Sequence, residues 1–160
     1  MHVKNMNEFC AREIMQWKYM PPYDFYNMDG EDEDLQELLH YSCVFQDDEL
    51  IGFFCTGEFA QIHIGHEVGV YPEMEGLIDI GIGLKPEWTG KGFGQEFFSF
   101  IIQHLQKDQN PKALRLSVAQ FNKRAVKLYS RLGFMTQTSF EVNNVPFLVM
   151  TKILSPKSGK

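Results

Sequence analysis

Three glycines at alternate positions, Gly90, Gly92 and Gly94, form the pattern in this chain that most directly indicates chemistry. A β-rich apolar run precedes them, and apolar residues at helical spacing follow them. A helix that begins in a glycine-rich turn points unpaired backbone N–H groups and the positive end of its dipole at a ligand, and the missing side chains let an anion approach. The turn therefore predicts a site for a phosphorylated ligand, and the open alternative is a tight turn that binds nothing.

Two common phosphate-binding motifs do not fit this turn. A P-loop needs a glycine five residues before Gly90, where Lys85 stands, and a Ser or Thr after Lys91, where Gly92 stands. A dinucleotide fingerprint has the spacing G-x-G-x-x-G, whereas this turn has G-x-G-x-G. Both nucleotide-fold interpretations are therefore excluded.

A second group of residues lies further along the chain. A strand-like run, Leu114–Ala119, is followed by Asn122 and by a helical pattern that contains Tyr129 and ends in Leu132–Phe134. An Asn before a helix can cap its free N–H groups, and the apolar spacing of three and four places Tyr129 on the inward face. From the residues alone, Tyr129 could equally be an ordinary core aromatic.

The glycine turn opening a helix, followed by strand, Asn, helix, Tyr and Leu-Gly-Phe, resembles the GNAT superfamily of N-acetyltransferases over roughly residues 45 to 152. The resemblance implies an α+β fold, a single-domain three-layer α/β/α sandwich whose mixed central sheet is splayed at the acetyl-CoA strand. It also implies transfer of an acetyl group from acetyl-CoA to a primary amine by direct attack in a ternary complex. The chain departs from the family at Thr89, where Gln or Arg is usual, so a side-chain contact is absent there while the backbone turn remains.

The resemblance assigns roles to residues of both motifs. The backbone N–H groups of Ile82 and Leu84 would polarise the thioester carbonyl, which preorganised donors do well. Tyr129 would protonate the departing coenzyme A thiolate, and Asn122 would bond to the pantetheine or phosphate arm. The full set expected to bind the co-substrate is Ile82, Gly83, Leu84, Thr89, Gly90, Lys91, Gly92, Phe93, Gly94, Gln95 and Asn122.

An attacking amine must lose a proton, because a free alkylammonium has a pKa of about 10.4. Asp79 is the expected base, since it lies in the strand where many family members place a base-acting Glu. Glu58, on the strand before, is the alternative and would act through water. A strand carboxylate held by purely structural partners would look the same in the sequence.

Charge is unevenly distributed along the chain, whose net charge is −6. Residues 21–84 include 15 acids and no Lys or Arg, whereas residues 85–160 include 12 bases and 4 acids. The basic part contains the expected co-substrate motifs, and the acidic part contains the segments that form the acceptor groove in the family. A cationic small-molecule amine is therefore the expected acceptor, although solvated turns would give the same acids. Tyr23, Asp24 and Tyr26, in a proline-rich loop, are expected to line the acceptor site or simply to pack over it.

Other functions stay open or are disfavoured by the sequence. Acetylation of a protein N-terminus or lysine remains an alternative, as does a non-catalytic acyl-CoA-binding module, although Tyr129 and Asp79 favour an enzyme. Nucleic-acid binding is not expected of an acidic chain. His63 and His66 do not have metal-site spacing, so no metal is expected. Three cysteines without a C-x-x-C pair predict reduced thiols.

The elements that must position these residues follow from periodicity and turn signals. We expect one N-acetyltransferase domain over residues 1–153 and a tail over 154–160. No apolar run reaches the roughly 18 residues of a membrane span, so a cytoplasmic protein is expected, with a homodimer as one candidate assembly. Strands are expected at 2–4, 42–46, 50–58, 77–84, 112–119, 134–142 and 145–153, helices at 7–17, 34–39, 93–106 and 122–132, a loop at 19–28, and irregular structure at 61–76.

Overall fold

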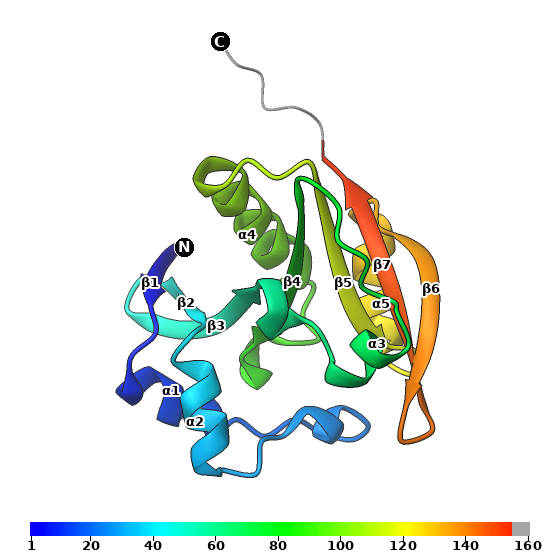
Figure 1. Ribbon diagram of the computed structural model, residues 1–160. Coiled ribbons are helices and arrows are strands. Elements are labelled where there is room, and N and C mark those ends of the chain that lie inside the picture. The colour runs from blue at the N-terminus through cyan, green and yellow to red at the C-terminus, as the bar shows by residue number, and fades with distance from the viewer. Residues whose placement is uncertain (155–160) are drawn as a thin grey trace. The chain divides into compact units, whose positions relative to one another are not determined.

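The computed structural model describes residues 1–154, which gather into two compact units (Figure 1). The first unit contains residues 1–55 and 82–94, and the second contains residues 56–81 and the described residues from 95 on. Strand β4 (Leu77–Leu84) begins in the second unit and ends in the first. The expected single domain over residues 1–153 stays a prediction, and the expected tail lies outside the described residues except for Leu154.

Within residues 1–154, seven strands form one mixed sheet in the order β1-β2-β3-β4-β5-β7-β6. The pair β4–β5 is parallel, and the pairs β1–β2, β2–β3, β5–β7 and β6–β7 are antiparallel. The expected α+β class with a mixed sheet is confirmed. The other strands are β1 (His2–Asn5), β2 (Ser42–Gln46), β3 (Glu49–Thr56), β5 (Ala113–Ala119), β6 (Met135–Val142) and β7 (Val145–Ile153).

Five α-helices and three short 3₁₀ helices connect the strands in the described residues. The α-helices are α1 (Glu8–Met15), α2 (Asp32–Leu38), α3 (His63–Glu67), α4 (Gly94–Asp108) and α5 (Lys123–Arg131). The 3₁₀ helices are η1 (Tyr23–Tyr26), η2 (Gly57–Ala60) and η3 (Pro86–Trp88). Over residues 1–154, no helix has the length and apolar character that a bilayer crossing requires.

The first unit has its own core beneath α1 and α2. The Asn7 side chain begins α1 by accepting the backbone N–H of Cys10 at 2.8 Å. Helix α1 then buries Ala11 and Ile14 at helical spacing, and the buried Leu38 of α2 joins the same cluster. The three cysteines, Cys10, Cys43 and Cys55, are all buried, and none of them forms a disulfide.

In the second unit, β5, β7 and β6 run side by side, with α5 behind β5 and β7 in Figure 1 and α3 in front of them. Alternate residues of a strand point to opposite faces, so Arg115, Ser117 and Ala119 share one face of β5. The Arg115 guanidinium lies over the Tyr71 ring, the Tyr71 and Ser117 hydroxyls are hydrogen-bonded, and Ala119 belongs to the same buried cluster as Tyr71. This face therefore supports the segment over residues 57–76.

Several elements differ from the sequence-based expectation, among them strand β3, helix α2 and the segment over residues 61–76. Strand β3 ends at Thr56, because Gly57 turns the chain with a φ of 72°. Glu58 therefore lies on η2 and not on the strand where it was expected. Helix α2 begins two residues earlier than expected, since its acidic residues suit a first helical turn. The expected irregular segment at 61–76 contains the short helix α3.

Candidate active site

The glycine turn lies in the first unit, between η3 and α4. Gly90 and Gly92 have φ values of 70° and 79°, in the left-handed region that side chains rarely adopt. A Cβ atom added at Gly92 would meet no atom within 4 Å, so the space beside this backbone is open. The turn thus has the conformation and the free space that an anion needs to approach the start of a helix.

Thr89 closes this turn internally. Its hydroxyl donates to the Pro86 carbonyl at 2.6 Å, and its backbone N–H donates to the same carbonyl at 3.1 Å. The short Thr89 side chain therefore ends η3 with a hydrogen bond to the backbone carbonyl of Pro86, the first residue of that helix. The longer Gln or Arg that is usual in the family could not make this compact contact.

Glu49, at the start of β3, holds the turn from the side. Its Oε2 accepts a hydrogen bond from Trp88 Nε1 at 3.0 Å and one from Lys85 Nζ at 3.3 Å. The hydrogen bond from Trp88 lowers the pKa of the Glu49 carboxyl, desolvation opposes that shift, and Lys85 adds to it. The Trp88 ring also packs on the Phe93 ring at 4.8 Å. We name the Glu49, Lys85 and Trp88 contacts the Glu49 clamp.

The end of β4 is fixed in the same unit. The Tyr19 hydroxyl donates to the Leu84 carbonyl at 2.7 Å, and the Lys85 N–H donates to the Ile51 carbonyl at 2.7 Å. Gly83 lies against the ring of Phe53, and a methyl group there would overlap that ring. The β4 backbone that is expected to bind the co-substrate is therefore held in place by packing and by hydrogen bonds.

Asn122, which precedes α5, and Tyr129, which lies on α5, belong to the second unit. The Asn122 side chain accepts the N–H of Ala125 at 3.1 Å, which confirms the expected helix cap. Tyr129 is 9% exposed, and its ring packs edge-on against Phe98 with centroids 5.4 Å apart and at 6.0 Å from Phe134. The inward position of Tyr129 is confirmed, and its role as an acid stays a prediction.

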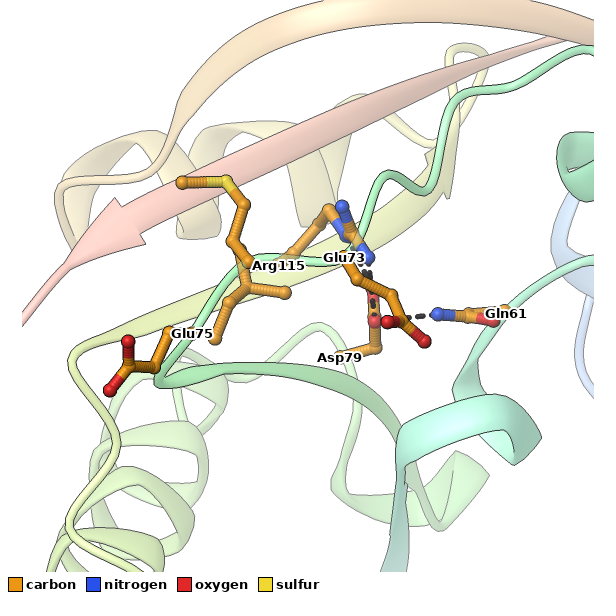
Figure 2. A pocket seen from close by; sticks show the side chains of 7 residues that line it. Gln61, Glu73, Glu75, Asp79 and Arg115 are labelled. Carbon is orange, nitrogen blue, oxygen red and sulfur yellow. Dashed lines mark hydrogen bonds and ion pairs between the residues drawn. The ribbon is translucent and has the colours of Figure 1, made fainter.

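A buried ion pair joins Asp79 of β4 to Arg115 of β5 in the second unit (Figure 2). Arg115 Nε donates to Asp79 Oδ1 at 2.6 Å, and its Nη2 donates to Oδ2 at 2.9 Å. Gln61 Nε2 also donates to Oδ2 at 2.7 Å, and Arg115 Nη1 donates to the Pro72 carbonyl at 2.8 Å. Asp79 and Arg115 are only 6% and 4% exposed, so the expected base is buried and is held by three hydrogen-bond donors.

Arg115 did not stand out as a functional residue in the sequence. The available signal was a charged residue inside the otherwise apolar run of β5, where Arg is rarely buried without a partner. The register of β4 and β5 places Asp79 directly opposite Arg115. The two strands are parallel neighbours joined by a long crossover connection. Their pairing therefore cannot be predicted from the residue pattern of either strand alone.

A cavity of about 540 Å³ opens beside this ion pair in the second unit. Figure 2 shows Glu73 and Glu75, on the loop before β4, beside the cavity with Asp79 and Arg115. Because Arg115 is paired with Asp79, the remaining charge of the lining comes from two exposed carboxylates. The lining residues are Gln61, Glu73, Met74, Glu75, Leu77, Asp79 and Arg115.

The other expected site residues lie in different surroundings. Glu58 is exposed on η2 in the second unit, three positions before Gln61. Tyr23, Asp24 and Tyr26 form η1 in the first unit, where Tyr23 is half-buried and the other two are exposed. Lys91 is exposed in the glycine turn of the first unit, and Gln95 is exposed at the start of the second unit's part of α4.

Within the described part of the chain, no group of three or more His, Cys, Asp or Glu side chains is placed to hold a metal ion. His63 instead lies 3.5 Å from Glu67, one turn along α3, and both are exposed.

Comparison with known proteins places the chain among acetyltransferases. A spermine/spermidine N(1)-acetyltransferase of Bacillus subtilis (strain 168) is 28% identical over 119 residues, which cover 73% of this chain and 74% of that protein. An aminoglycoside acetyltransferase solved with coenzyme A and kanamycin has a TM-score of 0.69 at 18% identity, over 94% of this chain and 93% of that one. A ribosomal-protein-alanine N-acetyltransferase from Escherichia coli has a TM-score of 0.64 at 16% identity, over 99% and 96%.

The sequence model of the Acetyltransferase (GNAT) family matches residues 7–134. This range includes the glycine turn, Asn122 and Tyr129, the residues that carried the resemblance. The structural likenesses show the same fold. The chain therefore belongs to the GNAT family of acetyltransferases, enzymes that take the acyl group from acetyl-CoA.

Proposed function

We propose that this protein transfers the acetyl group of acetyl-CoA to a primary amine of a cationic small molecule. The observation that carries the acceptor class is the cavity beside Asp79. Its lining contains one guanidinium, which is paired with Asp79, and two further carboxyl side chains, those of Glu73 and Glu75. An acidic lining favours a polycation, because opposite charges attract most strongly where solvent is partly excluded. The similar Bacillus subtilis protein is named for spermine and spermidine, which are molecules of this class.

The glycine turn would hold the diphosphate of acetyl-CoA through backbone N–H groups at the start of α4. Gly90 and Gly92 supply the backbone conformation, and the open space at Gly92 suits the approach of an anion. The N–H groups of Ile82 and Leu84 would polarise the thioester carbonyl, and Asn122 would contact the pantetheine arm. The thioester supplies the activated acetyl group for the reaction.

Protons must be moved twice in the reaction. The ammonium first gives one proton to a base, so that the neutral amine can form a bond to the acetyl carbon. As the carbon–sulfur bond then breaks, the nitrogen releases a second proton and the thiolate gains one. The Tyr129 hydroxyl would donate to the thiolate, whose free thiol has a pKa of about 8.5. Glu58 or Asp79 would accept the amine proton; Glu58 is exposed to water, which suits transfer through a water molecule.

The test is release of free coenzyme A thiol from acetyl-CoA in the presence of a panel of acceptors. The panel contains the polycationic amines spermine, spermidine and kanamycin, a monoamine whose molecule carries no net positive charge, and peptides with a free N-terminal alanine. Polyamines should give the highest kcat/KM. Preference for a peptide would replace this proposal with the protein acetyltransferase alternative, and tight acetyl-CoA binding without thiol release would favour a non-catalytic module.

The acidic lining can be tested directly. Glu73→Gln and Glu75→Gln should each raise the KM for a polyamine about three- to tenfold while leaving the acetyl-CoA KM unchanged, because each removes one attractive charge. Glu141→Gln, an exposed acid on β6, is the matched control. An equal effect in the control would show that overall charge and not the cavity determines acceptor binding.

A further inference from the structure

We propose that Asp79 and Arg115 act as one positioning pair that fixes the segment over residues 57–76 on β4 and β5 and thereby shapes the acceptor cavity. In this role Asp79 does not take the amine proton. The proposal rests on the proposed function for the identity of the acceptor, but not for the structural role of the pair.

The contacts of the pair reach two points of the 57–76 segment. Gln61, just after η2, donates to Asp79, and the Pro72 carbonyl, just before the cavity loop, accepts from Arg115. Between these points, Tyr71 stacks under the Arg115 guanidinium at 5.3 Å. The segment is therefore attached on both sides of α3 to a single buried ion pair.

Tyr71 extends the same network along β5. Its hydroxyl lies 2.6 Å from the Ser117 hydroxyl and accepts the backbone N–H of Ile62 at 3.1 Å. Tyr71 is 7% exposed, so these polar groups are satisfied away from water. A buried polar network with all partners present is rigid, because breaking any one contact leaves a desolvated group unpaired.

The geometry of Asp79 is poorly suited to accepting a proton from a substrate. Its two oxygens already accept three hydrogen bonds, two of them from the two nitrogens of one guanidinium. A substrate ammonium would have to compete with these three donors for the same two oxygens. Displacing the guanidinium would also leave the buried Arg115 without its partner, which is strongly unfavourable.

The pair also sets the charge of the cavity. An unpaired guanidinium in the lining would repel a cationic acceptor, and Asp79 neutralises it at hydrogen-bond distance. Glu73 and Glu75 can then dominate the field that an acceptor meets. Asp79 is in this sense a specificity residue that acts through Arg115.

Four variants of the full-length protein separate positioning from proton transfer. Arg115→Met removes the guanidinium and keeps the Asp79 carboxylate, while Asp79→Asn does the reverse. Asp79→Asn alone leaves the Arg115 guanidinium buried without a counter-charge and could fail to fold. The double variant Asp79→Asn/Arg115→Met buries neither charge, so it can still be measured in that case. Gln61→Met removes one donor to Asp79 and no charge. Arg131→Met, an exposed basic residue on α5, is the matched control.

The first measurement is hydrogen–deuterium exchange, which needs no substrate. Amides within residues 57–76 should exchange about tenfold faster or more in Arg115→Met and in the double variant, because charge-assisted hydrogen bonds that hold the segment are lost. Gln61→Met should give a smaller increase near residue 61, and Arg131→Met none. Unchanged exchange in Arg115→Met and in the double variant would overturn the proposal.

The second measurement is the pH profile of kcat/KM with spermine. If the pair positions the segment, the double variant, in which the net charge of the lining is unchanged, raises the acceptor KM, and the pH-dependent limb persists both in it and in Arg115→Met. If Asp79 takes the proton, every Asp79→Asn protein loses about 10²- to 10⁴-fold in rate together with that limb, whereas Arg115→Met keeps the limb. The latter result would overturn the proposal.

A wild type that acetylates no amine would refute the proposed function, and the exchange data alone would then decide the role of the pair.

Discussion

At the scale of single residues, Tyr129 offers the sharpest test of the chemistry. Tyr129→Phe keeps the ring that packs against Phe98 and Phe134 and removes only the hydroxyl. We expect kcat to fall about 10²-fold or more while the dissociation constant for acetyl-CoA stays within about twofold, because a proton donor acts in the transition state. Thiol release and calorimetric titration measure the two quantities.

The control is Tyr41→Phe, which removes a hydroxyl that donates to Glu37 in the first unit. If Tyr129→Phe turns over at the wild-type rate, Tyr129 is not the acid. If it loses acetyl-CoA affinity in proportion to its rate, the hydroxyl binds the co-substrate and does not donate a proton to the leaving group.

The sequence was informative about single residue types and much less about their partners. The inward position of Tyr129 and the cap at Asn122 followed from local spacing along one helix. The partners of Asp79 did not, because Gln61 and Arg115 reach it from distant parts of the chain. The sequence showed an acid among the apolar residues of a strand. Identifying Arg115 as its partner required the register of β4 and β5, which only the structure gives.

At the scale of elements, the Glu49 clamp should govern binding of acetyl-CoA. Trp88→Phe keeps the aromatic contact with Phe93 and removes the indole donor, and Glu49→Gln removes the charge that holds Lys85. Each should weaken acetyl-CoA binding about two- to tenfold with little change in kcat, because an exposed ion pair contributes modestly.

Calorimetric titration with acetyl-CoA measures this effect, and Asp48→Asn in the adjacent turn is the control for loss of one negative charge. Tighter binding in Glu49→Gln would contradict the positioning role and would show instead that the carboxylate repels the phosphates. A fall in kcat without a change in acetyl-CoA affinity would show instead that the Glu49 clamp affects the chemical step.

Element boundaries were predictable where glycine, proline or asparagine marks them. Strand β4 and strand β7 have the expected bounds, and Asn143 and Asn144 turn the β6–β7 hairpin with φ values of 49° and 68°. Glu58 was misplaced because an apolar run continued past Gly57, and an isolated glycine does not say in advance which φ it adopts.

At the scale of the whole molecule, stability should depend on pH through two groups of the first unit. Burial raises the pKa of the Cys43 thiol to about 12 from 9.0, and burial also raises the pKa of the Tyr41 hydroxyl above its ordinary value. Folded Cys43 keeps its proton while the unfolded chain loses it above pH 9.0, so the unfolded state binds fewer protons. Stability from this group is therefore complete below pH 9.0 and decreases as the pH rises toward about 12.

Thermal unfolding between pH 7 and pH 11 tests this dependence. The midpoint should fall with increasing pH above pH 9, and the fall should be shallower in Cys43→Ala. An identical pH dependence in Cys43→Ala and wild type would show that Cys43 makes no contribution, whatever the absolute stability of the variant.

The order of strands and helices was largely predictable because each has its own periodic pattern. The division of residues into two compact units was not, since it depends on contacts between distant segments and passes through the middle of β4. The cavity that we propose binds the acceptor was likewise invisible in the sequence, although the acids that line it belong to the charge excess of residues 21–84.

The burial of all three cysteines has a practical consequence for enzymology on this protein. A colorimetric thiol reagent such as Ellman's reagent should give a flat baseline with the native enzyme, so coenzyme A liberated in the reaction would be the only source of colour. The same reagent added during heating would report exposure of Cys10, Cys43 and Cys55. One dye could thus follow turnover at low temperature and loss of the folded state at high temperature in the same cuvette.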